Sequence, residues 1–289
     1  MTKAAFSYEF FPPSNTVSER TFWRSIGAIE ALNPSYFSIT YGALGTAQAR
    51  SVRVIKDLLD VSDVPVAAHL TFEGSTIEEI DAVAQHLRDI GVKRIVALRG
   101  DAREDAAQAR QRGQCYTNVA EFVAGLRSIY PFDISVACYP EVHPMAQNEK
   151  ADLLELKAKC DAGANRAITQ FFFNVDDFER FRDRVATAGI TTPVVAGILP
   201  IRDYKKMVSF AARCGASIPA RINKAYDRVA GDKSAEKAVW QQEFNTFVDQ
   251  LIERGCNEFH IYTLNQPVDM SHFINVEQRQ LAGARAAVA

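Results

Sequence analysis

The chain has 289 residues, of which 47% are hydrophobic and 24% charged, a composition typical of a globular protein with a sizeable core. Its 33 Lys and Arg against 35 Asp and Glu give a net charge of −2, so nothing electrostatic favours binding to nucleic acid or to an anionic membrane. No apolar stretch approaches the roughly 18 residues of a membrane helix. Glu9 and Pro12-Pro13 interrupt the apolar run near the N-terminus, so we expect no signal peptide. Five cysteines without C-x-x-C spacing favour reduced thiols in a cytoplasmic protein.

Eight strand-like runs follow one another along the chain, most of them followed by a helical pattern. The predicted strands cover residues 6–11, 36–40, 64–71, 94–98, 133–138, 166–172, 193–198 and 258–263. The predicted helices cover residues 17–32, 47–59, 76–90, 118–129, 149–162, 175–188, 203–213 and 233–254. An extra helix is expected near residues 217–229, before the last long one.

Several helix ends carry recognisable signals. Ser75-Thr-Ile-Glu78 matches a capping box, in which the Ser75 hydroxyl would accept a hydrogen bond from an early backbone N–H. Gly91, Gly163 and Gly189 follow three of the predicted helices, where glycine commonly ends a helix.

Repeated alternation of buried strands and helices predicts a parallel sheet. Eight such units in 289 residues fit one (β/α)₈ TIM barrel over residues 1–289, with the extra helix before the last unit. The main alternative is an open, doubly wound sheet, which would normally carry G-x-G-x-x-G after its first strand. That motif and the P-loop motif are both absent, so the barrel is favoured.

Polar residues follow many of these strands at the point where each strand ends. In a barrel these carboxyl ends meet at one rim, which is where barrel enzymes place their chemistry. Arg99 and Asp101, for example, directly follow strand 94–98. The expected rim residues are Glu9, Thr40, Tyr41, His69, Thr71, Arg99, Gly100, Asp101, Tyr139, Glu141, His143, Gln170, Thr263, Asn265 and Gln266.

Glu9 is the candidate acid of this rim. It shares a strand face with Ser7 and Phe11, opposite Phe6, Tyr8 and Phe10. A barrel strand has helices on one side and the barrel interior on the other, so Glu9 has no free solvent face. We expect a partly desolvated carboxylate whose pKa is raised toward that of a general acid.

Two other readings concern the remaining polar residues. Gln170 interrupts an apolar strand, and a buried amide needs partners such as a planar heterocycle with paired donors and acceptors. The set His69, Asp101, Glu141 and His143 offers metal-ligand types, but H-x-H and H-E-x-x-H are absent. Histidines that hydrogen-bond a ligand are therefore favoured over a metal site. The residues alone predict a barrel enzyme for a polar, partly aromatic small molecule.

Motifs at these same positions resemble methylenetetrahydrofolate reductases over nearly the whole chain. They are Ser7-Tyr-Glu-Phe-Phe-Pro-Pro13, Ser38-Ile-Thr-Tyr-Gly-Ala43, His69-Leu-Thr71, Ile95-Val-Ala-Leu-Arg-Gly-Asp101, Cys138-Tyr-Pro-Glu-Val-His-Pro144, Asp161-Ala-Gly-Ala-Asn-Arg-Ala-Ile-Thr-Gln-Phe-Phe-Phe173, Gly197-Ile-Leu-Pro200 and Phe259-His-Ile-Tyr-Thr-Leu-Asn265. The resemblance implies a barrel that binds FAD at the strand carboxyl ends. NADH or NADPH would reduce the flavin, and 5,10-methylenetetrahydrofolate would then take the hydride to give 5-methyltetrahydrofolate, which feeds methionine synthesis.

The resemblance also implies roles for individual residues. Glu9 matches the family's acid, and Asp101 matches the aspartate beside flavin and pterin. Expected cofactor contacts are Thr40, Tyr41, Ala43, His69, Arg99, Gly100, Asp101, Tyr116, Thr117, Tyr139, His143, Asp152 and Lys159. Expected substrate contacts are Gln170, Lys206, Phe210 and Gln266. Relatives form dimers or tetramers, so a homo-oligomer is expected.

The chain departs from the family pattern at four of these positions. Glu155 and Ala158 stand where bacterial relatives carry an asparagine and an arginine, which removes a positive charge near the flavin diphosphate. Lys206 and Gln266 replace a glutamine and an arginine that contact folate. Two alternatives therefore stay open: a folate-binding one-carbon enzyme without flavin, and a metal-dependent barrel hydrolase.

Overall fold

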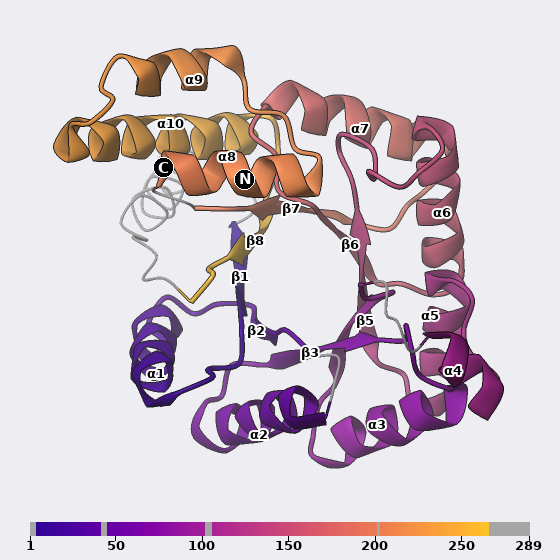
Figure 1. Ribbon diagram of the computed structural model, residues 1–289. Coiled ribbons are helices and arrows are strands. Elements are labelled where there is room, and N and C mark those ends of the chain that lie inside the picture. The colour runs from indigo at the N-terminus through magenta and orange to yellow at the C-terminus, as the bar shows by residue number, and fades with distance from the viewer. Residues whose placement is uncertain (1–3, 42–44, 102–105, 201–202, 266–289) are drawn as a thin grey trace, which may run out of the picture.

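The computed structural model describes residues 4–41, 45–101, 106–200 and 203–265. Eight parallel strands close into a barrel in the order β1 to β8 (Figure 1). They are β1 (Ala5–Phe10), β2 (Tyr36–Ile39), β3 (Val66–Thr71), β4 (Arg94–Leu98), β5 (Asp133–Cys138), β6 (Arg166–Thr169), β7 (Val194–Ile198) and β8 (Glu258–Tyr262). The predicted (β/α)₈ barrel is confirmed. One domain over residues 1–289 stays a prediction.

Helices surround the barrel, and α8, α9 and α10 gather outside β7 and β8 (Figure 1). The helices are α1 (Thr16–Glu30), α2 (Gly45–Val61), α3 (Ile77–Asp89), α4 (Ala106–Arg112), α5 (Val119–Ile129), α6 (Glu149–Asp161), α7 (Val175–Thr187), α8 (Tyr204–Cys214), α9 (Ala220–Asp227) and α10 (Lys233–Glu253). The predicted extra helix is α9. Helix α4 was not predicted, because only Ala109 on it is buried and its sequence shows no apolar face. Within the described ranges, no helix is both long and apolar enough to cross a membrane.

The capping box of α3 lies one residue later than predicted. Thr76 Oγ1 accepts a hydrogen bond from Glu79 N at 3.2 Å, and the Glu79 carboxylate accepts one from Thr76 N at 2.9 Å. The sequence offers two registers, because Ser75-Thr76 is followed three residues later by Glu78-Glu79. Burial of the apolar face of α3 against the barrel selects the second register.

The main hydrophobic core lies between the outer face of the barrel and the helices. Strand β1 shows how alternation builds it: Tyr8 and Phe10 are buried, and the Phe10 ring packs edge-on against Phe22 of α1 with ring centroids 5.5 Å apart. Ser7 and Glu9 point the other way, into the barrel, where Ser7 meets His260 of β8. The predicted placement of Glu9 on the inner face is thereby confirmed.

The barrel interior is polar for a fold whose interior is usually filled by Val, Ile and Leu. Its buried polar side chains are Ser7, Ser38, His69, Ser135 and His260. A small apolar cluster of Tyr36, Ala67 and Val96 stands apart from the main core.

Charged residues close the amino-terminal end of the barrel. Asp133 at the start of β5 pairs with Arg94 of β4 at 2.5 Å and with Arg166 of β6 at 2.5 Å. Both guanidinium groups lie over the ring of Tyr36, at 5.2 and 5.9 Å from its centroid. The Tyr36 hydroxyl beneath them is buried and makes no hydrogen bond within the described structure.

Candidate active site

A cleft of about 420 Å³ opens at the carboxyl ends of the strands. Ligand sites of barrel enzymes lie at this face, so its lining tests the sequence predictions. Of the predicted site residues, those lining the cleft are Glu9, Thr40, Tyr41, His69, Gly100, Asp101, Tyr139, Gln170 and Phe210. Residues that sequence reasoning did not select also line it, among them His260, Tyr262, Leu199 and Cys214.

Glu9 lies at the base of this cleft between two histidines. Its Oε2 atom is 3.3 Å from His69 Nε2 of β3 and 3.5 Å from His260 Nε2 of β8. In the sheet, Glu9 pairs with Ser38 on one side and with Tyr262 on the other, while His260 pairs with Ser7. The Glu9 side chain is only 15% exposed, so its ionisation depends on these neighbours.

The pKa of Glu9 departs from the sequence prediction. Burial does oppose ionisation, as expected, but the His69 and His260 imidazoles outweigh it and hold the pKa of Glu9 below its ordinary value. The predicted raised pKa was therefore wrong. Strand alternation gave the burial of Glu9, whereas the two histidines come from strands far away in the sequence.

His69 is buried. Burial lowers its pKa; Glu9 acts in the opposite direction, and His260 adds to the lowering. Its Nε2 atom is also 2.5 Å from the hydroxyl oxygen of Ser38 on β2. An imidazole with two polar neighbours fits the predicted hydrogen-bonding role.

The segment after β4 has a backbone shape that requires glycine. Gly100 has φ +91°, and a Cβ atom there would lie 3.0 Å from Cβ of Thr71. The turn leaves Asp101 exposed at the cleft mouth. Arg99 lies beside it and extends outward, with a guanidinium nitrogen 3.6 Å from Met145 Sδ.

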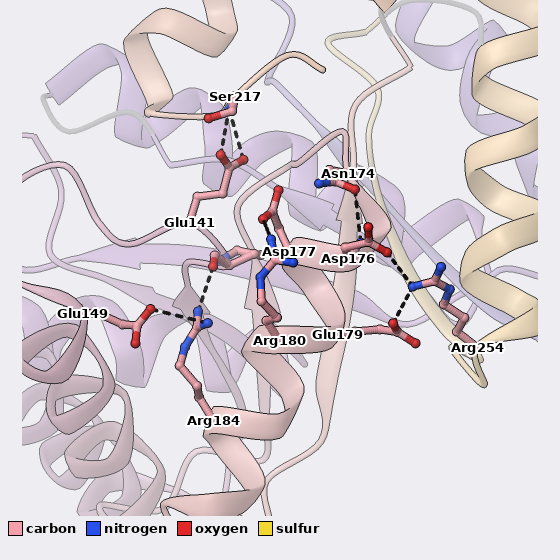
Figure 2. A network of polar contacts seen from close by, with 11 residues as sticks. Glu141, Glu149, Asn174, Asp176, Asp177, Glu179, Arg180, Arg184, Ser217 and Arg254 are labelled. Carbon is pink, nitrogen blue, oxygen red and sulfur yellow. Dashed lines mark hydrogen bonds and ion pairs between the residues drawn. The ribbon is translucent and has the colours of Figure 1, made fainter. Parts of the chain in front are cut away.

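The loop after β5 carries Tyr139 and His143 and is held from several sides. Figure 2 shows Glu141 accepting hydrogen bonds from the backbone N–H of Ser217 at 3.0 and 3.1 Å. Arg184 of α7 donates to the carbonyl oxygen of Pro140 at 3.0 Å. These bonds hold Val142 at φ +78°, a conformation that a β-branched residue rarely adopts. Glu141 thus fixes the loop, and the Tyr139 and His143 rings meet edge to face at 4.4 Å.

A second group of predicted cofactor residues lies beside this loop. The Asp152 carboxylate accepts a hydrogen bond from His143 N at 3.0 Å. Lys159 is only 8% exposed, and its ammonium group donates to the carbonyl oxygen of Ala137 at 2.8 Å. Burial raises the pKa of Tyr139 to about 12, with Asp152 acting in the same direction.

Some predicted site residues lie elsewhere. Tyr116 packs against Phe72 and Phe122, and its hydroxyl lies 3.4 Å from Asp81 of α3, so it sits outside the cleft. Thr117 donates to Glu121 at the start of α5 and also stays outside. Lys206 is exposed on α8, one turn from Phe210. Ala43 and Gln266 fall outside the described residues.

Two residues of β8 were missed by sequence reasoning, although alternation along 258–262 would have placed both inside the barrel. His260 contacts Glu9, and the Tyr262 hydroxyl donates to the carbonyl oxygen of Thr169 at 2.7 Å. Tyr262 lies against Gly197, where a Cβ atom would come within 2.8 Å of its ring and 2.0 Å of the Thr169 oxygen. Only glycine therefore lets Tyr262 lie beside the cleft.

The residues of the predicted metal alternative do not form a metal centre in this structure. Across the described ranges, no group of three or more His, Cys, Asp or Glu residues could hold a metal ion. Glu141 in particular is bonded to Ser217, away from His69.

The fold and this cleft define a TIM-barrel protein with a small-molecule site at the carboxyl ends of its strands. The family model described as "Methylenetetrahydrofolate reductase" matches residues 1–275. The 5,10-methylenetetrahydrofolate reductase of Escherichia coli K12 is 40% identical over 268 residues, which cover 93% of this chain and 88% of that protein. The chain belongs to the methylenetetrahydrofolate reductase family, and is thus an oxidoreductase.

Other relatives agree with this family assignment. The 5,10-methylenetetrahydrofolate reductase of Pectobacterium carotovorum is 39% identical over 90% of this chain and 85% of that protein. "Methylenetetrahydrofolate reductase (NADH) 1" of Arabidopsis thaliana is 31% identical over 91% of this chain but only 46% of its own length. Among solved structures, a Clostridium thermocellum protein described as binding two copies of 5-methyl-5,6,7,8-tetrahydrofolic acid has a TM-score of 0.56 at 17% identity, covering 90% of this chain and 88% of that one. That likeness concerns the fold.

Proposed function

We propose that this protein reduces 5,10-methylenetetrahydrofolate to 5-methyltetrahydrofolate with a hydride from NADH or NADPH, carried by FAD. The observation that carries the proposal is Glu9, a carboxylate held between His69 and His260 at the base of the cleft. Opening the five-membered ring of the substrate requires a proton at the departing nitrogen, and a side chain in this position can supply it. Family membership supports the same reaction.

The residues beside the cleft fit a flavin dinucleotide. Lys159 is a buried ammonium with one described hydrogen bond, to Ala137, so two of its three N–H groups remain for anionic oxygens. Tyr41 and Tyr139 offer aromatic surface for a planar ring. When bound, FAD would supply a hydride carrier between NAD(P)H and the folate. Thr40, His69, Gly100 and His143 would complete its contacts.

The substrate side of the cleft is formed by Gln170, Phe210 and Asp101. Gln170 follows β6, and its amide oxygen accepts a hydrogen bond from Phe171 N at 3.0 Å, which leaves the amide N–H₂ group for a heterocycle. Phe210 of α8 presents a ring on which a pterin or a nicotinamide can stack. Asp101 at the mouth provides negative charge that favours the cationic iminium form of the folate.

Glu9 must gain its proton before it can act. The neighbouring histidines favour the carboxylate form of Glu9. Ligands that fill the cleft exclude water and strengthen the effect of burial, which favours the protonated acid. Glu9 then transfers its proton to the departing nitrogen, and the iminium carbon accepts the hydride.

Glu155 modifies the proposed flavin site. It lies near enough to Asp152 and His143 to favour the proton-bound form of both. Its carboxylate therefore opposes a diphosphate at this edge, and we infer weaker FAD binding than with a neutral side chain. We further propose a cytoplasmic location, since all five cysteines are free thiols. The expected homo-oligomer stays a prediction.

The visible absorption spectrum of the purified protein, before and after anaerobic NADH, tests the proposed function. We expect flavin bands that bleach with NADH and recover when 5,10-methylenetetrahydrofolate is added. A colourless protein that cannot be reconstituted with FAD would overturn the flavin part and favour a flavin-independent folate enzyme. Recovery with oxygen but not with the folate would overturn the substrate assignment.

A further inference from the structure

Beneath Glu9, polar side chains continue down the inside of the barrel. His260 Nε2 is 3.5 Å from Glu9 Oε2, and the Nδ1 atom of the same ring is 2.7 Å from Ser7 Oγ. Both residues are almost fully buried, His260 at 1% and Ser7 at 3% exposure. The imidazole therefore has one nitrogen toward the acid and the other toward the amino-terminal end of the barrel.

Tyr36 lies next in this direction. Its ring stacks on His260 with centroids 6.0 Å apart and planes inclined by 27°. Burial raises the pKa of its hydroxyl, the neighbouring Ser7 and Ser135 hydroxyls lower it, and the hydroxyl makes no hydrogen bond within the described structure. A buried hydroxyl without a partner costs free energy that a phenylalanine would avoid, so this one calls for a role other than stability.

The far end of this row reaches charged, partly exposed groups. Ser135 Oγ is 3.4 Å from a guanidinium nitrogen of Arg166. That arginine pairs with Asp133, whose side chain is 27% exposed at the amino-terminal end of the barrel. The charged groups at this end are therefore partly exposed to solvent, on the opposite side of the barrel from the cleft.

The reaction creates a need for such a route. Under the proposed function, on which this inference rests, every turnover removes one proton from Glu9 while bound ligands shield it from the solvent above. We use the name interior file for four side chains in order from the floor to Glu9: Ser135, Tyr36, Ser7 and His260. We propose that the interior file carries protons from the amino-terminal end of the barrel to Glu9.

The transfer balances without any change of oxidation state. The Glu9 O–H bond breaks as the N–H bond of the leaving nitrogen forms. His260 then gives its Nε2 proton to the Glu9 carboxylate and takes the Ser7 hydroxyl proton at Nδ1. Tyr36 reprotonates Ser7, Ser135 reprotonates Tyr36, and solvent supplies Ser135. A small rotation of the Tyr36 hydroxyl toward each serine in turn is required. His260 is left with its proton on Nδ1 and returns to the Nε2–H tautomer by proton exchange once the products leave the cleft, when Nε2 gains a proton from water and Nδ1 returns one to Ser7.

Tyr36→Phe in the flavin-loaded protein tests the proposal. The ring, its stacking on His260 and its contacts with the arginines remain, and no described hydrogen bond is lost, so thermal unfolding should not change. Flavin reduction by NADH, which takes no proton from Glu9, should also proceed at the wild-type rate. Single-turnover reduction of 5,10-methylenetetrahydrofolate should slow at least about tenfold, with a larger solvent deuterium isotope effect.

Tyr130→Phe is the matched control, because Tyr130 is a part-buried tyrosine that packs on Phe132, outside the file. It should leave both half-reactions unchanged. The pH profile of the folate step is measured in the wild type and in both variants. The charged or titratable groups that face Glu9 are His69, His260 and Tyr262, and all three remain in Tyr36→Phe.

The proposal is overturned if Tyr36→Phe reduces folate at the wild-type rate and with the wild-type isotope effect. Equal slowing of both half-reactions, or equal slowing in Tyr130→Phe, also overturns it, because either result reports a general structural effect. Failure of the proposed function looks different: the wild-type protein itself would then leave the folate unreduced, and the file would lose its purpose with it.

Discussion

Glu9→Gln tests the central residue of the site with the smallest change in shape. The substitution keeps the side-chain volume and the contacts to His69 and His260 but removes the transferable proton. General acid catalysis by a positioned side chain contributes about 10²- to 10⁴-fold in rate, which corresponds to about 2.7–5.4 kcal/mol of transition-state stabilisation. We therefore expect folate reduction to fall by that factor while flavin reduction by NADH is retained.

The structure also sets what should happen to stability and to His69. The pKa of Glu9 lies below its ordinary value, so folding favours its charged form, and removing that charge should leave the thermal midpoint unchanged or lower it. Glu9 acts to raise the pKa of His69, so the His69 pKa should fall further in the variant. Stopped-flow absorbance of the two half-reactions and NMR titration of the histidines measure both effects. Folate reduction within tenfold of wild type, or loss of both half-reactions together, would refute the reasoning.

Three further predictions concern pH, backbone shape and charge. Burial lowers the folded-state pKa of His69 and His143 below 6.5, so the unfolded chain binds more protons than the folded one near this pH. The free energy of unfolding should therefore decrease as the pH falls through 6.5. Equal free energies of unfolding from denaturant titrations at pH 7.5 and 5.5 would contradict this. Gly100→Ala should destabilise the protein by about 1–2 kcal/mol in thermal unfolding, because Gly100 has φ +91°. Gly27→Ala is the control, since Gly27 lies in helix α1 and has no such φ. Equal unfolding midpoints for Gly100→Ala and the wild type would argue against strain at Gly100. Glu155→Ala should tighten FAD binding up to about fivefold in a flavin-quenching titration, and this gain in affinity should decrease as salt is added. Unchanged affinity would remove Glu155 from the flavin site.

Local sequence patterns were sufficient for the architecture. Each strand is a short apolar run stopped by glycine, proline or a polar residue, and most of the helices between them show periodic apolar faces. These patterns involve only residues that are close in the sequence, so they can be recognised without knowing which elements pack together. The limits of local information appear at α4, which has no apolar face, and at α3, where two capping registers are encoded and packing chooses one.

Much of the candidate site could also be anticipated, because a closed parallel barrel brings every strand end to one rim. Gln170 and His69 line the cleft for this reason alone. Tyr116 shows the opposite case, since it lies in a long connection whose course no strand fixes, and it packs between α3 and α5 instead. Glu141 was chemically suitable as a ligand but bonds to Ser217, a residue brought near only by the packing of the helices.

The sequence by itself determined the eight-unit barrel, the inward direction of Glu9 and the residues at the rim, because all of these follow from periodicity along the chain. Only the tertiary structure decided the protonation of Glu9, because its electrostatic environment comes from His69 on β3 and His260 on β8. The same holds for the polar row under the site, where Ser7 of β1 and Tyr36 of β2 lie beside His260 of β8, and Ser135 of β5 lies near Tyr36. Charge and hydrogen bonding act over a few ångströms in space, and closure of the barrel sets which residues share that distance.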